Sequence, residues 1–178
     1  MNRKSSFMLF AIVVIGVMRV THAQTPPAAN PLDVVPEKLP FDTPYGPPIS
    51  LEQADRVMAA AMNEAKNRTW KMVCSILDSG GNLLLLKRMD GAQLASIDIA
   101  IHKGRTAVKF RRETKVFESG VQSGGVFQTT IDDVIAARGG IPLVTDGKLI
   151  GAIGCSGGSG SQDEVVAKAG IAALTTAK

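Results

Sequence analysis

One histidine carries most of the chemistry that this sequence could perform. Apart from His22 near the N-terminus, the 178-residue chain contains only His102. Asp98 precedes it by four residues on the same face of a predicted helix, where its carboxylate could accept a hydrogen bond from one ring nitrogen and fix the tautomer. The other nitrogen would then be free for a metal or a proton. The alternative is a surface histidine with an incidental acidic neighbour.

The chemistry open to a single imidazole is limited. A protein-only zinc site needs three or four histidine, cysteine or carboxylate ligands, so the residue types speak against one. Haem needs only an axial ligand, because the porphyrin supplies the in-plane bonds, and His102 could be that ligand. Together with Asp98, His102 could instead be the catalytic acid and base of an enzyme acting on a small organic acid.

Basic residues follow His102 along the same helix and its exit: Lys103, Arg105, Lys109, Arg111 and Arg112. Such cations could hold the propionates of a tetrapyrrole or the carboxylate of a small acid. A run of charges is also typical of a solvated helix face. Lys103, Arg105 and Lys109 are the candidate cofactor-binding residues of this group, and His102 is the candidate metal ligand.

A glycine-rich loop over residues 154–160 joins a predicted strand to the last predicted helix. Free backbone N–H groups and the helix dipole make such a loop an anion-binding corner, so Ser156, Gly157 and Gly158 are further candidate cofactor-binding residues. The loop also matches the G-x-S-x-G motif of hydrolases, in which the catalytic histidine follows the serine. No histidine follows Ser156, which speaks against a serine hydrolase.

The first 23 residues have the pattern of a cleavable signal peptide. Arg3 and Lys4 precede an apolar run over residues 7–18, and Thr21 and Ala23 are small residues before a predicted cleavage site. This order is the one that signal peptidases recognise. The apolar run is too short for a membrane anchor, which needs about 20 residues. We therefore expect a periplasmic or secreted protein without a membrane segment after cleavage.

The signal segment also accounts for most of the apparent basicity. It holds three of the twenty Lys and Arg residues and none of the sixteen Asp and Glu residues, so the rest of the chain has a net charge of +1. A nearly neutral chain offers little support for nucleic-acid binding. About 155 residues remain after cleavage, which is enough for one domain with a hydrophobic core.

Of two cysteines, Cys74 lies in a predicted strand and Cys155 directly follows the end of another. In an exported chain they could form a disulfide. They could equally be two small buried apolar residues, and the sequence leaves both interpretations open.

The elements that must position these residues follow a proline-rich extended arm over residues 24–49, which contains eight of the nine prolines. Apolar spacing and turn residues then predict a helix over 51–67, with a capping box at Ser50 and Gln53, followed by strands over 70–77 and 83–88. A helix over 94–110, a weaker helix over 114–119 and a helix beginning near 130–133 come next. Strands over 141–145 and 148–154 and a last helix with a capping box at Ser161 and Glu164 complete the order. Paired hairpins with helices favour an α+β fold.

Several separated motifs resemble the GlcG/HbpS-like haem-binding family, which is similar to the PduO C-terminal domain. They are Leu83–Ala92, Ile101–Ala107, Gly139–Leu143, Asp146–Gly147, Ile150–Gly154, Ser156–Gly158 and Gln162–Glu164. The resemblance covers about residues 50–176. One departure is Gly104, where members commonly have alanine. A mid-helix glycine costs about 0.5–1 kcal/mol relative to alanine. The close backbone approach of a ligand or partner could explain it, and so could simple sequence drift.

The resemblance implies a five-stranded antiparallel sheet flanked by helices, profilin-like, over residues 50–178. Residues 126–130 are the candidate fifth strand. It also implies assembly into homo-oligomers, and some members bind haem and take part in haem sensing or degradation.

Three functions remain open at this point. The first is an exported protein that binds haem or another tetrapyrrole through His102. The second is the organic-acid enzyme with His102 and Asp98 as its catalytic pair. The third is an oligomeric scaffold without catalysis, in which the arm embraces a neighbouring subunit.

Overall fold

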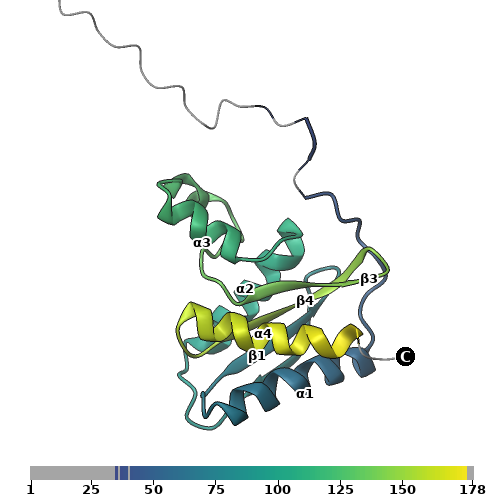
Figure 1. The fold of residues 1–178 in the computed structure, drawn as a ribbon, viewed down its shortest axis with the longest axis vertical. Coiled ribbons are helices and arrows are strands. Elements are labelled where there is room, and N and C mark those ends of the chain that lie inside the picture. The colour runs from purple at the N-terminus through teal and green to yellow at the C-terminus, as the bar shows by residue number, and fades with distance from the viewer. Residues whose placement is uncertain (1–34, 36, 40, 176–178) are drawn as a thin grey trace, which may run out of the picture. The chain divides into compact units, whose positions relative to one another are not determined.

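The computed structural model describes residues 35, 37–39 and 41–175. The described residues from Lys38 onward belong to one compact unit, drawn in Figure 1. The predicted signal peptide and the beginning of the predicted arm lie outside the described residues. Within the described ranges, no helix is long and apolar enough to cross a bilayer.

The central sheet has four antiparallel strands in the order β2-β1-β4-β3. The strands are β1 (Val73–Asp78), β2 (Leu83–Arg88), β3 (Gly140–Thr145) and β4 (Lys148–Ser156). Both predicted hairpins are confirmed, because β1 pairs with β2 and β3 pairs with β4. The α+β class is therefore correct, whereas the expectation of five strands is wrong for the part of the chain that the structure describes. The likeness to profilin stays a prediction.

Helices cover both faces of this sheet. Helices α1 (Leu51–Asn67) and α4 (Gly160–Thr175) pack side by side on one face, as Figure 1 shows, and α2 (Ser96–Phe110) packs on the other. Strand β1 contributes side chains to the hydrophobic core on each face of the sheet, because successive residues of a strand point to opposite faces. Cys74 and Ile76 lie in the core with α1 and α4, and Leu77 lies in the core with α2.

Helix α1 begins where the sequence predicts. The side chain of Ser50 accepts a hydrogen bond from the backbone N–H of Gln53, and the Gln53 side chain accepts one from the backbone of Ser50, which is the predicted capping box. The residues before α1 pair with β4. The Leu149 N–H donates a hydrogen bond to the Pro44 carbonyl, and the Leu149 carbonyl accepts one from the Gly46 N–H. The end of the arm thus lies along the sheet of its own chain.

Residues 126–130 form a 3₁₀ helix, η2 (Val126–Thr130), so the candidate fifth strand is wrong. The hydroxyls of Thr129 and Thr130 donate to the carbonyls of Val126 and Phe127, three residues earlier, at 2.7 Å. Such local bonds compete with a strand ladder. The helix predicted to begin near 130–133 is also wrong, because residues 131–139 form turns and bends. The weaker predicted helix is present as α3 (Lys115–Gln122).

The cap of α4 differs from the prediction by two residues. Gln162 accepts a hydrogen bond from the backbone of Ser159 at 2.8 Å and donates its own N–H to the Ser159 hydroxyl at 3.4 Å. The capping box is therefore Ser159 with Gln162, not Ser161 with Glu164. Both pairs fit the sequence signature, and the helix begins at Gly160.

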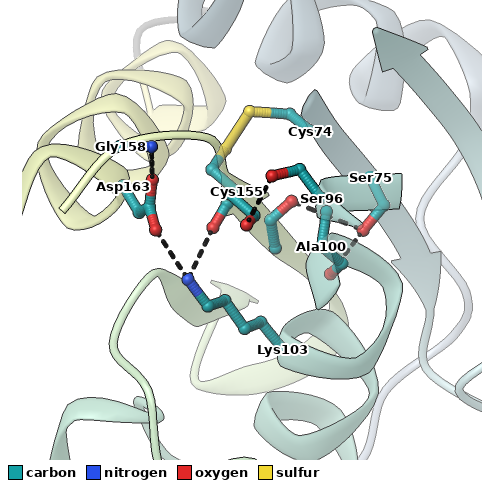
Figure 2. Close-up of a disulfide and its surroundings, with 10 residues drawn as sticks. Cys74, Ser75, Ser96, Ala100, Lys103, Cys155, Gly158 and Asp163 are labelled. Atoms are coloured by element: carbon teal, nitrogen blue, oxygen red, sulfur yellow. Dashed lines mark hydrogen bonds and ion pairs between the residues drawn. A yellow bond between two sulfur atoms is a disulfide. The ribbon is translucent and has the colours of Figure 1, made fainter. Parts of the chain in front are cut away.

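Cys74 and Cys155 form a disulfide between β1 and β4. The two residues are register partners with their Cα atoms 4.2 Å apart, and both are fully buried. Figure 2 shows the bond beside the loop that leaves β4. The disulfide and the core-packing interpretations of the sequence are therefore both correct, because the cysteines are bonded and are also part of the hydrophobic core.

Candidate functional site

His102 lines an open hollow on the outer side of α2. The hollow measures about 430 Å³, and its walls are Asp98, Ile101, His102, Arg105 and Asp133. The imidazole is partly exposed, and no hydrogen bond or ion pair joins it to any residue that the structure describes. An imidazole without a partner beside an open space is available to a ligand.

The packing of α2 on the sheet determines where His102 points. Gly104 and Gly154 lie so close that a side chain on Gly154 would collide with the Ala100 carbonyl and the Gly104 backbone. Ala100 and Gly104 therefore face the sheet. Successive residues in a helix are about 100° apart, so His102, two residues from each, points away from the sheet. The mid-helix glycine is explained by contact with the protein's own sheet.

Asp98 lies on the same side of α2 as His102 but is exposed, and no hydrogen bond between the two side chains is present. The structure thus brings both members of the candidate catalytic pair to one hollow. It does not show the hydrogen bond from His102 to Asp98 that would fix the tautomer of the imidazole. Arg105 shares the hollow and forms no ion pair with a described residue. It is a cation available beside the imidazole.

Asp133 completes the wall of the hollow and was missed by the sequence analysis. Its carboxylate forms an ion pair with Lys109, and its backbone carbonyl accepts a hydrogen bond from the Thr106 hydroxyl at 2.6 Å. The hydrogen bond from Lys109 lowers the pKa of Asp133. Its backbone is left-handed, with φ of +64°. Its nearest sequence signal was the Thr130–Asp133 pattern, which was interpreted as a helix start.

Lys103 does not reach the hollow. Its ammonium group donates to the Asp163 carboxylate at 2.7 Å and to the Cys155 carbonyl at 3.2 Å, and its side chain is almost fully buried. Asp163 also accepts a hydrogen bond from the Gly158 N–H at 3.0 Å, as Figure 2 shows. Burial raises the pKa of Asp163 despite the opposing effect of Lys103. Lys103 joins α2 to β4 and α4.

The glycine-rich loop also lies outside the hollow. The Ser156 hydroxyl is buried and donates to the Ser96 hydroxyl at 3.1 Å. The Gly158 N–H is occupied by Asp163, so a carboxylate from this chain already takes the anion corner. Gly157 has a φ of +153° and lies against the backbone of Lys71.

The candidate residues therefore divide into two places. His102, Asp98 and Arg105 line one hollow, and Lys109 borders it through Asp133. Lys103 and Ser156 are buried at the junction between α2, β4 and α4, and Gly157 and Gly158 lie at its more exposed edge. In the described ranges, no group of three or more His, Cys, Asp or Glu residues could hold a metal ion by itself.

An antiparallel sheet between two helical layers, with an open histidine-lined hollow on α2, defines a small α+β protein with a surface histidine site. The family model described as "Haem degrading protein HbpS-like" matches residues 49–172. The chain belongs to the HbpS-like family.

Individual relatives agree with this assignment. Protein GlcG of Escherichia coli strain K12 is 40% identical over 108 residues, which are 61% of this chain and 81% of GlcG. The crystal structure of Klebsiella pneumoniae protein ORFY is similar with a TM-score of 0.69 and 31% identity, covering 79% of this chain and all of that one. The crystal structure of a PduOC:heme complex has a TM-score of 0.66 and 33% identity, covering 72% of this chain and 96% of that one.

Proposed function

We propose that this chain binds haem or another tetrapyrrole, with His102 as an axial ligand of the iron. The observation that carries the proposal is the imidazole of His102, which opens on a hollow of about 430 Å³ and has no hydrogen-bond partner among the described residues. A ring nitrogen engaged in a hydrogen bond would first have to give up that bond.

The donor set of the hollow fits haem better than a bare metal ion. Haem needs one or two axial ligands from the protein, and His102 can supply one. Arg105 lies in the same wall without an ion pair and can hold a propionate. Lys109 already neutralises Asp133, which reduces the repulsion between that carboxylate and an anionic ligand. Bound haem would supply redox-active iron, and the chain would bind and orient it.

The comparisons support the same ligand. The family description names haem degradation, and a solved relative at 33% identity is a haem complex. A role in haem sensing or degradation belongs to this proposal.

Export of the chain is part of the proposal. It rests on the signal-peptide pattern of residues 1–23, and the Cys74–Cys155 disulfide fits an oxidising compartment. A periplasmic or secreted homo-oligomer is the form in which we expect the protein to act. Mass determination of the exported chain tests both points, because a chain beginning before residue 24 contradicts the predicted cleavage and a monomeric mass contradicts the assembly.

No arrangement in the described residues favours the enzyme for small organic acids. The Asp98 carboxylate forms no hydrogen bond with His102, and the loop 154–160 contributes no residue to the hollow. The scaffold function likewise gains no support from the described end of the arm, because Pro44 and Gly46 pair with Leu149 of the same chain.

Titration of the purified chain with haem, followed by absorption of the Soret band, tests the proposal. We expect saturable binding at one haem per chain, and we expect His102→Ala to shift the band and weaken binding. Free imidazole added to His102→Ala should restore the original band, because it replaces the missing ligand. Lys148→Ala is the matched control, since Lys148 lines a separate hollow. An identical spectrum in His102→Ala would exclude His102 as the ligand.

A further inference from the structure

A second hollow of about 430 Å³ lies beyond the C-terminal end of α2. Its apolar walls are formed by Phe41, Val116, Ile141 and Pro142. Its cationic side chains are Arg111, Arg112 and Lys115, against one acidic residue, Glu113. It shares no lining residue with the hollow beside His102. An apolar space bordered by an excess of cations suits a ligand that is apolar and negatively charged.

Arg112 is the cation that remains available in this hollow. Its guanidinium carbon lies 3.6 Å from the centre of the Phe41 ring and 5.1 Å from that of Phe117, so aromatic rings hold the group in place. Its Nε donates to the Phe110 carbonyl at 3.1 Å. Its two terminal amino groups have no partner among the described residues. Neither group is among the buried polar atoms that lack a partner, so both remain accessible. Burial, and then the charge of Arg111, lower the pKa of Arg112.

The neighbouring cations differ from Arg112 because a terminal nitrogen of each is already engaged by the protein. Lys115 forms an ion pair with Glu164 at 3.3 Å, and an Arg111 terminal amino group donates to the Thr43 carbonyl at 3.3 Å. The fixed, open edge of Arg112 is therefore the point of charge at which an anion would be held. A guanidinium edge matches a carboxylate through two parallel hydrogen bonds.

The two arginines lie at a strained turn of the backbone at the C-terminal end of α2. Arg111 is left-handed, with φ of +53°, and the Arg112 N–H bonds back to the Ala107 carbonyl. This position in a helix cap is usually occupied by glycine, because a side chain is unfavourable there. Strained non-glycine residues cluster at functional sites. The arginine pair at this turn agrees with a function of the adjacent hollow.

We propose that this hollow binds a small amphipathic carboxylate, with the carboxylate on the terminal amino groups of Arg112 and the apolar part against Val116, Ile141 and Pro142. The site is separate from the proposed haem site. Its occupant would be a free organic acid with an apolar chain or ring. The exposed Val116 side chain, with 42% of its surface accessible, gains burial when such a ligand binds.

Calorimetric titration with decanoate and with decanol tests this site. The two probes share an apolar chain and differ in charge, so we expect decanoate to bind at least about tenfold more tightly to the purified chain. Arg112→Gln should remove this difference, and Arg112→Lys should retain part of it, because lysine keeps the charge without the planar edge. Arg105→Gln, in the other hollow, is the matched control and should leave decanoate binding unchanged.

A second variant keeps the test decisive if Arg112→Gln fails to fold. Val116 is exposed, so Val116→Asp should fold with an unchanged melting temperature and lose decanoate binding by repulsion. Equal affinities for decanoate and decanol, or unchanged decanoate binding in Val116→Asp, would overturn the proposal. Displacement of bound haem by decanoate would also overturn it, because the two ligands would then share one site. A normal Soret band in Arg112→Gln supports two separate sites.

Discussion

Lys103 and Asp163 form an ion pair inside the protein, with 2.7 Å between Nζ and Oδ2 and only 3% of each side chain exposed. The pair connects α2 to the first turn of α4, and Lys103 also donates to the Cys155 carbonyl beside the disulfide. It holds in place the helix that presents His102 on its opposite side. The buried contacts of α2 and its proposed ligand-binding residues therefore lie on different faces of the helix.

Breaking this pair on one side should destabilise the fold strongly. Lys103→Met leaves the Asp163 carboxylate buried without its cation, so we expect the free energy of unfolding to fall by about 3–5 kcal/mol. The double variant Lys103→Met, Asp163→Leu should recover much of the loss, since no unpaired charge remains. Urea unfolding of the three proteins measures both effects. A loss below about 1 kcal/mol in the single variant would mean that the pair is not buried as described.

Removal of the disulfide should destabilise the protein without changing its fold. Cys74 and Cys155 are 81 residues apart in the chain, and a loop of this length predicts a loss of about 4.5 kcal/mol in the chain-entropy model. Guanidinium unfolding of Cys74→Ala, Cys155→Ala against the parent chain gives the value. Because both cysteines are fully buried, a reductant should cleave the bond only in denaturant. Rapid reduction of the native protein would contradict this burial.

The two glycines at the contact between α2 and β4 should respond differently to alanine. In Gly154→Ala the new methyl group would meet the Ala100 carbonyl, which is backbone and cannot move aside, so we expect a loss of about 3 kcal/mol or more. In Gly104→Ala the collision is with the end of the Leu77 side chain, and better helix propensity of about 1 kcal/mol offsets it. Thermal unfolding compares them. Equal losses would show that the contact is looser than described.

Acid stability should depend on Glu118. Burial opposes its ionisation, but hydrogen bonds from Arg138 outweigh that effect and lower the pKa of Glu118. Because the folded carboxylate releases its proton more readily than the unfolded one, its stabilising effect is complete above the ordinary glutamate pKa of about 4.3 and is lost as the pH falls through the lowered value.

Glu118→Gln should therefore lose about 1.5–3 kcal/mol at pH 7 and less at pH 3. Urea unfolding between pH 7 and pH 3 measures the difference from the parent chain. Glu52→Gln is the matched control, because Glu52 contacts Arg56 on the exposed surface of α1 and should contribute little. A difference that stays constant down to pH 3 would contradict the lowered pKa of Glu118.

The sequence predicted most of the fold because its local signals are strong. The capping box of Ser50 and Gln53 defines the start of α1, and apolar runs around two short turns define the hairpins. Residues 126–130 were wrongly predicted as a strand. A strand needs a neighbouring strand edge to pair with, whereas the Thr129 and Thr130 hydroxyls form hydrogen bonds with carbonyls three residues earlier. The cap of α4 was misplaced because two overlapping residue pairs carry the same signature.

The candidate site was predictable only in part. The spacing of Asp98 and His102 placed them on one side of a helix, and both line the same hollow. Arg105 also lines this hollow. The neighbouring Lys103 has the same charge as Arg105 but points into the protein, because its partner Asp163 is 60 residues away in the chain. Sequence spacing along one helix contains no information about such a partner. Asp133 was missed for the same reason.

The most direct test of the proposed function is the structure of the chain crystallised with haem. We predict iron bonded to an imidazole nitrogen of His102, with a propionate near Arg105 in the hollow on the outer side of α2. Haem bound elsewhere on the chain, with the His102 ring free of iron, would contradict the proposal.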